Sequence, residues 1–493
     1  MLAIGLAVLV VVALAPPPAG LGTAGFVTLG LLCVMALWWF TETLPVTATA
    51  LLPFLVLPAT GAGRLAEVAA SYMSPVIFLV LGGALLALAM EKSGLHRRLA
   101  VAVLGRAGSE PRGLVLAFMV ATAFISMWVS NTSTTLIMMP IAASVLAAVL
   151  PEEARRSQAE RHFAVALVLG VAYGASIGGL GTLIGSPTNA IGAGVIERTL
   201  GVKLGFLHWL AVGIPLVAMA IPLAWLILTR LAFPFALPAV ERGRLLAALG
   251  PQRRWSVAER RLLPLLVLTA VLWVALPVLK LPALAGIEDS SVAILAALLL
   301  FVIPAGRGPA GSAAGAAAEP PPGPPSDPGP DGAPAGTLLE WRDTTRAPFD
   351  VLFLFGGGLA LAEAITASGL GGWLGTWIGG AATLPMPLFV VLVVLVVIVV
   401  TEFASNVAAA ASFIPVVAGV TTALGLDPLV LTLPAAMAAT WGFMMPAGTP
   451  PNAIAYASGY VTVPQMIRAG IWIDLLGLLV IPASVAIAVA TFL

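Results

Sequence analysis

Residue types that build disulfides, metal clusters and charged surfaces are scarce in this chain. Its 493 residues include one cysteine and three histidines, and only 9% are Asp, Glu, Lys or Arg. Soluble domains carry roughly 25% charged residues, so an ordinary soluble domain is excluded. The single cysteine, Cys33, excludes an intrachain disulfide. Because no two histidines share a predicted helix face and Cys33 stands by itself, the sequence also argues against a membrane-embedded enzyme.

Apolar residues dominate instead. They make up 60% of the chain, and the mean hydropathy is +1.07. A helix needs about 20 apolar residues to cross a bilayer, and many runs approach this length. The sequence therefore predicts an all-α polytopic membrane protein. The apolar runs outside the motifs described next lie at residues 2–15, which we interpret as a retained first helix, and at 23–40, 46–60, 76–90, 207–233, 262–279, 291–304, 351–367 and 471–493.

A short polar motif occurs twice inside this apolar chain. Residues 130–132 are Ser-Asn-Thr and residues 405–407 are Ser-Asn-Val, each four positions after a hydroxyl residue, Ser126 or Thr401. Residues four positions apart in a helix lie on the same face, so the spacing predicts that each pair of hydroxyl groups lies together. The flanking apolar runs are shorter than a membrane span, which favours re-entrant hairpins with polar tips. A continuous helix whose polar residues bond to neighbouring helices is the alternative for each copy, and the repetition argues against it. The flanking runs are 114–129, 136–150, 388–400 and 408–420.

A second pair of motifs supports a duplicated site. Residues 185–189 are Gly-Ser-Pro-Thr-Asn and residues 448–452 are Gly-Thr-Pro-Pro-Asn, and each interrupts an apolar run. Proline removes a backbone donor and glycine relaxes the backbone dihedrals. Each motif therefore predicts a broken helix with free carbonyl and N–H groups. Interrupted hydrophobic segments at matching positions of two halves indicate a transporter site.

Basic residues predict the orientation of the chain in the membrane. If the N-terminus is cytoplasmic, only four of the 23 Lys and Arg residues lie outside, namely Arg64, Arg198, Lys203 and Lys280. Such a bias follows the positive-inside rule. The first hairpin then enters from the cytoplasm and the second from outside, so the two halves have opposite topology and the C-terminus lies outside. Between them, residues 305–336 are rich in Pro, Gly, Ala and Ser, which predicts a disordered linker.

Four longer motifs carry a family resemblance. They are Thr-Glu-Thr-Leu-Pro at residues 41–45, Ser-Met-Trp-Val-Ser-Asn-Thr at 126–132, the glycine-rich stretch 176–187, and Met-Pro-Ala-Gly-Thr-Pro-Pro-Asn-Ala-Ile at 445–454. In order, spacing and duplication they resemble the divalent anion/sodium symporter family, which includes dicarboxylate, citrate and sulfate transporters. The resemblance extends over nearly the whole chain.

The resemblance implies a particular architecture. We expect two inverted-topology repeats, about 11 transmembrane helices and two re-entrant hairpins. The family also implies a homodimer with a scaffold and a mobile transport domain, working as an elevator in the plasma or inner membrane. The expected parts are scaffold helices at 1–113, the first hairpin with interrupted helix 5 and helix 6 at 114–236, scaffold helices at 237–304, a linker at 305–348, a scaffold helix at 349–384, and the second hairpin with interrupted helix 10 and helix 11 at 385–493.

The resemblance also implies the residues that bind the substrate. Amide and hydroxyl donors, helped by helix N-termini, can hold carboxylates without a buried arginine. The pseudo-symmetry of such a site suits an anion with a charged group at each end. The sequence departs from the family motif at Val407, where a threonine hydroxyl is missing and substrate preference is affected. The implied substrate residues are Asn131, Thr132, Ser186, Asn406, Val407 and Thr449.

Two sodium sites are implied in the same way, one beside each motif. Hard cations prefer oxygen ligands, and broken helices expose backbone carbonyls. Sodium at these positions offsets the charge of a dianion, which couples the binding of the two. The implied ligands are Ser126, Ser130, Asn131 and Gly185 at the first site, and Thr401, Ala404, Asn406 and Gly448 at the second.

The family leaves several functions open. We expect a sodium-coupled symporter of C4-dicarboxylates such as succinate, malate and fumarate, and no nucleic-acid partner. A citrate or sulfate symporter of the same family is an alternative, and so is a sodium-independent dicarboxylate exchanger. A passive anion channel is the alternative from another class, because donors and helix dipoles also serve channels.

Acidic residues in or near membrane segments are a separate question. Glu42, Glu363, Glu402 and Asp474 are of this kind, and an ionisable group at such a position indicates function by default. Glu42 and Glu402 each follow a threonine near a predicted helix end. We interpret them as groups that cap or brace those ends rather than as a proton relay.

Overall fold

Helices form nearly all the regular structure in this computed structural model, which describes residues 1–151, 156–249, 254–279, 282–284, 286–306, 336–378 and 384–491. Up to residue 306 the elements are α1 (Leu2–Leu14), α2 (Thr23–Phe40), α3 (Val46–Thr49), α4 (Leu52–Ala59), α5 (Leu65–Ser71), α6 (Pro75–Ser93), α7 (Leu95–Leu104), α8 (Pro111–Ser126), α9 (Asn131–Val149), α10 (Gln158–Gly179), α11 (Pro187–Leu200), α12 (Phe206–Leu226) with the π-helical turn η2 (Ile227–Ala232), α13 (Arg242–Leu249), α14 (Val257–Leu279), η3 (Pro282–Leu284) and α15 (Asp289–Val302). From residue 336 they are η4 (Trp341–Arg346), α16 (Phe349–Ala367), α17 (Leu370–Ile378), α18 (Met386–Phe403), α19 (Asn406–Ala423), α20 (Pro428–Ala438), α21 (Pro450–Ala457) and α22 (Val463–Thr491).

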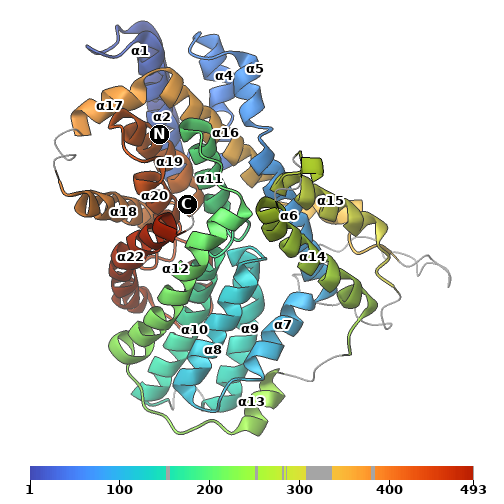
Figure 1. Cartoon of the computed structure of the whole chain (residues 1–493). Helices are drawn as coiled ribbons and strands as arrows, with labels where there is room; N and C mark the ends of the chain where they lie inside the picture. Colours follow the sequence, from blue (N-terminus) through green and yellow to red (C-terminus); the bar gives the residue numbers. More distant parts are fainter. Residues whose placement is uncertain are drawn as a thin grey trace.

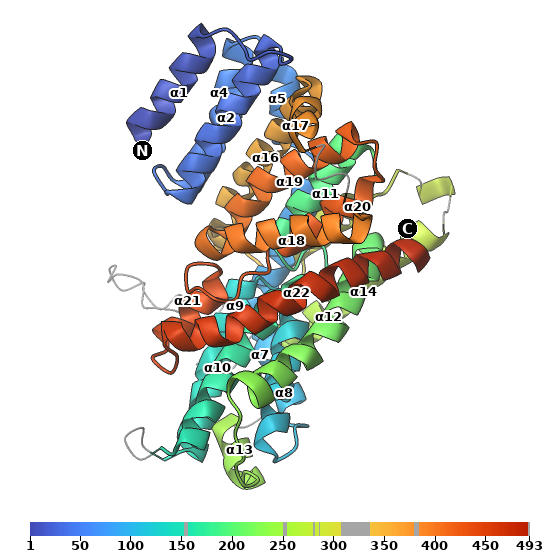
Figure 2. The same cartoon turned by 90° about the vertical axis from the view of Figure 1, so that its left-hand side faces the viewer.

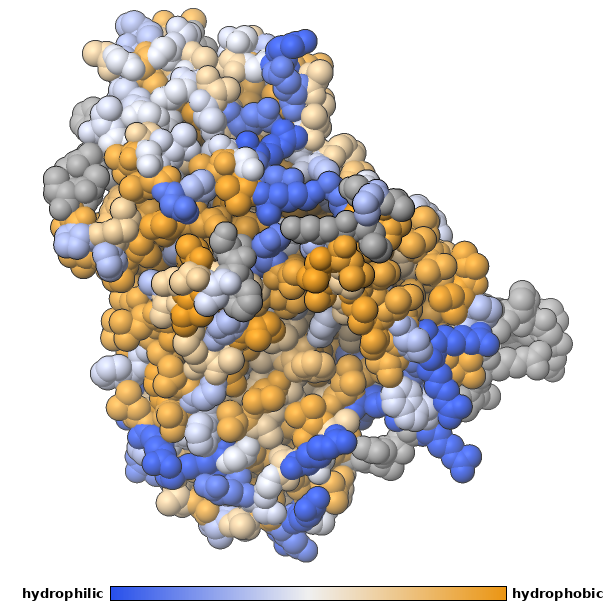
Figure 3. Space-filling view, in the orientation of Figure 1, coloured by the Kyte–Doolittle hydropathy of each residue, from blue (hydrophilic) through white to orange (hydrophobic). Residues whose placement is uncertain are grey.

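The all-α prediction is confirmed. Among the described residues, ten helices are long and apolar enough to cross a membrane, and three of them, α9, α18 and α19, are arms that the sequence assigned to the two hairpins. Large apolar side chains also face outward, as Leu298 of α15 and Leu268 of α14 do with 58% and 53% of their surface exposed. Figure 3 shows such residues covering much of the visible face. An apolar exterior on this scale requires a lipid environment, so the chain is an integral, multi-pass membrane protein.

Helix α10 lies at the centre of the helices that carry the first motif. In its most apolar window 94% of the residues are buried, against 22% for α14. Small residues allow this packing: a Cβ added to Gly178 would lie 2.3 Å from Ala123 Cα in α8, and one added to Gly174 would lie 2.9 Å from the Met119 carbonyl oxygen. Glycine is needed where backbones approach this closely. Figure 1 shows α8, α9 and α10 side by side.

Each predicted break in the chain is present. Helix α8 ends before Ser130 and α9 begins after it, while α18 and α19 are separated by Ala404 and Ser405. The expectation that all four arms are too short to span a membrane is wrong. Helix α8 has 16 residues, but α9 has 19, and α18 and α19 have 18 each. The arms are longer because α9 and α19 begin inside the polar motifs, at Asn131 and Asn406, and α18 continues past Thr401 to Phe403.

The two halves of the chain interlock through their broken segments. Helix α9 packs against α21, and α19 packs against α11, so each motif helix of one half meets an interrupted helix of the other. Helices α16 and α17 pack against α19, and α18 packs against α22 (Figure 2). The polar motifs are therefore positioned by contacts across the halves as well as within them.

The predicted disordered linker lies mostly outside the described residues, at 307–335. Its two ends meet: the Ala305 N–H donates to the Gly336 carbonyl at 2.6 Å, and Pro304 forms an isolated antiparallel bridge with Thr337. The segment that follows is ordered. Its η4 turn is held to the end of α6 by the Lys92 to Asp343 ion pair at 2.6 Å.

Candidate functional site

The first site is assembled where α8 ends and α9 begins. Ser126, the last residue of α8, is fully buried, and its Oγ lies 2.8 Å from both Asn131 Oδ1 and the Ala175 carbonyl oxygen of α10. Asn131 is the first residue of α9. Three elements that are separate in the sequence therefore bring oxygen atoms to one point.

The side-chain amide of Asn131 faces only oxygen atoms at this point. If its nitrogen is turned toward them, it donates to Ser126 Oγ at 2.8 Å, to Ala175 O at 3.2 Å and to Gly185 O at 3.3 Å. If its oxygen faces them, four oxygen atoms converge: two backbone carbonyls, the Ser126 hydroxyl and the Asn131 amide oxygen. Only the Ser126 hydroxyl then has a hydrogen to donate within the cluster. Such a cluster of oxygens fits a hard cation. Ser126, Asn131 and Gly185, three of the predicted sodium ligands, are thus brought together.

The second site repeats the two contacts of the Ser126 hydroxyl. Thr401 Oγ1, also fully buried, donates to Asn406 Oδ1 at 2.9 Å and lies 2.8 Å from the Ala439 carbonyl oxygen. The partners of Thr401 are a residue five positions later and a backbone carbonyl, as they are for Ser126. The sequence motifs did not reveal the carbonyls of Ala175 and Ala439, because a backbone oxygen carries no residue signature.

The Gly-Ser-Pro-Thr-Asn and Gly-Thr-Pro-Pro-Asn motifs each end in an asparagine that holds the preceding loop by hydrogen bonds. Asn189 Nδ2 donates to the carbonyls of Gly179 at 2.7 Å and Thr182 at 2.8 Å. Asn452 Nδ2 donates to the carbonyls of Gly442 at 3.2 Å and Met445 at 3.1 Å. In both halves the acceptors lie ten and seven positions earlier. These residues were quoted in the motifs but had no predicted role, and their repetition was the signal that could have given one.

Two hydroxyl residues stand at the starts of the interrupted helices. Ser186 occupies the N-cap position of α11 with φ −138° and ψ 140°, and Thr449 occupies that of α21 with φ −138° and ψ 147°. Both are buried, with 4% and 1% of their surface exposed. A proline follows each of them and fits the first helical turn. Helix N-termini favour negative charge through their free N–H groups, so each hydroxyl lies where an anionic group is stabilised.

Glu402 braces the loop that leads to Gly448. Its carboxylate is fully buried and accepts hydrogen bonds from the backbone N–H groups of Phe443, Met444 and Met445, at 2.8 Å from Met445. Several N–H donors stabilise a buried carboxylate strongly. Glu402 therefore has a bracing role, as expected, but it holds the loop between α20 and α21 rather than a helix end. Asp474 of α22 is 6% exposed, and its carboxyl lies beside the Glu402 carboxylate and the Phe443 N–H.

The other two acidic residues lie away from this region. Glu42 is exposed, follows α2 and adopts a left-handed backbone with φ 47°. Glu363 of α16 accepts hydrogen bonds from Arg198 of α11 at 2.7 Å and from Ser71 of α5 at 3.0 Å. It links helices of different parts of the chain rather than serving the oxygen clusters.

The whole chain matches known transporters. The family model for the sodium:sulfate symporter transmembrane region covers residues 1–489. The chain belongs to the divalent anion/sodium symporter family. The sodium-dependent dicarboxylate transporter SdcS of Staphylococcus aureus strain USA300 is 36% identical over 470 residues, which is 94% of this chain and 86% of that relative. SdcS of Staphylococcus aureus strain N315 matches to the same extent, 36% over 470 residues.

A solved structure supports the fold of this symporter family member. The YdaH transporter of Alcanivorax borkumensis, whose crystal structure reveals an unusual topology, superimposes with a TM-score of 0.54. The two sequences are 16% identical, and the superposition covers 85% of this chain and 85% of the YdaH chain. At this identity the likeness concerns the fold. Family membership makes the protein a transporter rather than an enzyme.

One geometric expectation for the symporter is wrong. Ser126 and Ser130 do not share a helix face, because α8 ends at Ser126 and Ser130 is the N-cap of α9. Thr401 and Ser405 are separated in the same way, since Ser405 is the N-cap of α19. A serine hydroxyl favours the start of a helix over its interior. Ser130 Oγ accepts the N–H of Ser133 at 3.2 Å and is otherwise exposed.

The remaining predicted residues flank the clusters without joining them by hydrogen bonds. Thr132 and Val407 are half-buried in the first turns of α9 and α19. Ala404 is buried, with extended backbone between α18 and α19. Within the described parts of the chain, no hydrogen bond connects Asn131 directly to Asn406.

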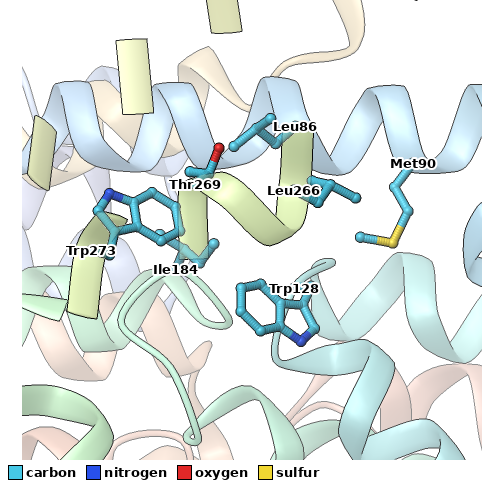
Figure 4. A pocket seen from close by; sticks show the side chains of 7 residues that line it. All are labelled: Leu86, Met90, Trp128, Ile184, Leu266, Thr269 and Trp273. Atoms are coloured by element: carbon cyan, nitrogen blue, oxygen red, sulfur yellow. The ribbon is translucent and has the colours of Figure 1, made fainter. Parts of the chain in front are cut away.

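A small pocket of about 10 Å³ lies beside the first site, but it does not suit an anion (Figure 4). Trp128 and Ile184 line it from the motif side, facing α6 and α14, and none of the lining residues is charged. The Thr269 hydroxyl in it already donates to the Leu265 carbonyl at 2.8 Å. We interpret the pocket as an apolar seam between these helices. Its lining residues are Leu86, Met90, Trp128, Ile184, Leu266, Thr269 and Trp273.

Proposed function

We propose that this protein is a sodium-coupled symporter of divalent organic anions, most of all C4-dicarboxylates. The observation that carries this proposal is the duplicated oxygen cluster around Asn131 and Asn406. Each cluster supplies ligands for a cation, and each is followed along the chain by a capped helix start suited to an anionic group. The dicarboxylate preference is supported by the identity to the relatives named sodium-dependent dicarboxylate transporters.

Sodium is the coupling ion of this family, and the side chains here fit it. The first ion would take oxygens from Ser126, Ser130, Asn131 and Gly185. The second would take them from Thr401, Ala404, Asn406 and Gly448. Ala175 and Ala439 add a carbonyl beside each cluster, because they already contact Ser126 and Thr401. Oxygen-only sites of this kind suit hard cations.

The anion would be held from both halves of the chain. Asn131, Thr132 and Ser186 would meet one end, and Asn406, Val407 and Thr449 the other. Amide and hydroxyl donors at helix starts suit carboxylates, and two such sets suit a molecule with two carboxylates. Bound sodium offsets the dianion's charge, so each binds more tightly when the other is present.

Transport would follow from rigid movement of one part of the molecule against the other. We assign residues 114–236 and 385–493 to a transport domain, and 1–113, 237–304 and 349–384 to a scaffold that also forms a homodimer. The apolar pocket between Trp128 and Trp273 lies between these parts and offers few polar contacts to break during sliding. The two repeats would have opposite topology, with a cytoplasmic N-terminus, an external C-terminus and a plasma membrane location.

Uptake of labelled succinate into proteoliposomes tests the proposal. With an inward sodium gradient we expect accumulation above the external concentration, and replacement of sodium by potassium or choline should abolish it. Uptake that ignores sodium but needs internal dicarboxylate would establish an exchanger instead. Uptake that equilibrates without accumulation would establish a channel.

Competition measures the substrate class. Unlabelled succinate, citrate and sulfate are added in turn to the sodium-driven assay, and the ranking of their inhibition constants is compared. We expect succinate to compete best. The description of the family model favours sulfate as the second candidate, and stronger competition by sulfate would replace the C4-dicarboxylate assignment.

A further inference from the structure

We propose that Thr188 and Thr440 are positioning residues that join the two half-sites through a chain of hydroxyl groups ending at Ser186. The chain orients its hydrogens when Ser186 donates to the anion. This inference rests on the proposed function, because it takes Ser186 as a substrate residue.

The three hydroxyl groups are in contact and lie away from solvent. Ser186 Oγ is 2.9 Å from Thr188 Oγ1, and Thr188 Oγ1 is hydrogen-bonded to Thr440 Oγ1. Ser186 is 4% exposed, and both threonines have no exposed surface. Thr188 belongs to α11 in the first half, whereas Thr440 follows α20 in the second. This contact is a direct polar link between the halves.

Counting hydrogens gives the chain a direction. Each hydroxyl has one hydrogen, and a carboxylate only accepts. When Ser186 donates to a carboxylate, its contact with Thr188 has to be one in which Thr188 donates. The hydrogen of Thr188 is then used, so Thr440 has to donate to Thr188. Asn189 Oδ1 is 3.5 Å from Thr188 Oγ1, which is too long to compete strongly.

Without an anion the same three hydroxyls have no fixed direction. Either atom of each pair can donate, so the chain alternates between two orientations. An anion at Ser186 selects one of them, and hydrogen bonds aligned in a chain polarise and strengthen one another. The threonines thus make Ser186 a better donor without touching the substrate.

The far end of the chain is next to the second cluster. Thr440 directly follows Ala439, whose carbonyl is contacted by Thr401 at 2.8 Å. The chain has no mirror copy, because the position matching Thr188 in the second motif is Pro451, which has no hydroxyl. Consistent with this, Asn452 Oδ1 is buried without a partner. The link is therefore a one-sided feature added to a duplicated site.

The test compares variants that separate the hydroxyl from the shape of the side chain. Thr188→Val keeps the shape and removes the hydroxyl, whereas Thr188→Ser keeps the hydroxyl. Thr440→Val removes the hydroxyl at the far end of the chain, and a double variant combines Thr188→Val with Thr440→Val. Thr28→Val is the matched control, because Thr28 of α2 is fully buried and its hydroxyl donates to the Ala24 carbonyl of its own helix.

The readout is the KM and kcat of sodium-driven succinate uptake by the purified, folded protein. For Thr188→Val we expect a KM about fivefold higher with kcat little changed, the size of one net hydrogen bond. Thr188→Ser should match the wild type, and Thr440→Val should raise KM about twofold through lost polarisation. The double variant should equal Thr188→Val, because the chain is already broken at Thr188.

Each other outcome overturns the inference. A Thr188→Ser variant as impaired as Thr188→Val would show that shape matters rather than the hydroxyl, and additive valine effects would show that no chain exists. If Thr188→Val does not fold, an unchanged KM in Thr440→Val decides against the proposal. A wild type without sodium-driven uptake overturns the proposed function itself, whereas an active wild type with normal valine variants overturns only this inference.

Discussion

Ser126 in the first half and Thr401 in the second make matching hydrogen bonds, but the residues that follow them act differently. After Ser126 comes Met127, whose carbonyl accepts the Thr182 hydroxyl at 2.5 Å. After Thr401 comes Glu402, whose carboxylate accepts three backbone N–H groups of its loop. What the halves share is the oxygen cluster, and what differs is the means of holding the loop beside it.

The glycines of the two loops differ in the same way. A Cβ on Gly185 would lie 2.6 Å from the Gly179 carbonyl oxygen, whereas one on Gly448 would lie 3.4 Å from its nearest neighbours. The first loop is therefore held by tight backbone packing and the second by a buried charge. The difference teaches that a duplicated oxygen cluster can be held by two different arrangements of the neighbouring loop.

The largest effect is expected at the asparagines of the oxygen clusters, which both halves share. Asn131→Ala and Asn406→Ala each remove an amide from an oxygen cluster, and we expect either change to reduce sodium-driven uptake about 100-fold or more, since several polar contacts are lost together. Uptake in proteoliposomes measures this, with size-exclusion profiles checking that the variants fold. Near-normal uptake in one variant but not the other would mean that the halves are unequal even in their shared part.

Substitutions at Gly185 and Gly448 should have different effects, because the two loops are held differently. Gly185→Ala forces a carbon against a carbonyl, and overpacking of this kind costs about 1–3 kcal/mol, so we expect uptake to fall about tenfold or more. Gly448→Ala should change uptake less than about twofold, because 3.4 Å is an ordinary contact. The rate of sodium-driven uptake in proteoliposomes measures both. Equal losses would contradict the difference in packing.

Glu402 should matter for stability as well as uptake. Glu402→Gln removes the charge that three N–H groups bind, and we expect about 2 kcal/mol of destabilisation, typical of hydrogen bonds to a charged group. Asp427→Asn is the control, because the Asp427 carboxylate accepts one backbone N–H, that of Leu429 at 2.9 Å, and its effect should be smaller. Thermal unfolding in detergent, with and without sodium, measures the difference. A larger loss in the Asp427 variant would show that Glu402 is not the brace.

The smallest effect is expected at Val407. Val407→Thr restores the hydroxyl that the first half carries at Thr132, and we expect a change of about fivefold or less in relative affinity, the size of one net hydrogen bond. The ranking of succinate, citrate and sulfate in competition assays measures it. An unchanged ranking would mean that this side chain does not face the anion.

The sequence determined much of the framework. Hydropathy predicts an all-α membrane protein, because apolar helices satisfy their own backbone groups in lipid. The repeated Ser-Asn motifs and the Gly-Ser-Pro and Gly-Thr-Pro motifs mark four places in the described chain where a new helix begins. They also point to Ser126, Asn131 and Gly185, which the fold does bring together.

Only the tertiary structure decided which atoms meet. The carbonyls of Ala175 and Ala439 complete the clusters from other helices, and sequence spacing cannot reveal a backbone oxygen supplied from 38 or 49 positions away. Spacing also misplaced Ser130 on the helix face of Ser126, because it assumed a continuous helix where the N-cap begins a new one. The Thr188 to Thr440 bond crosses 252 residues. Local pattern fixes where the chain breaks, whereas long-range packing fixes what each break faces.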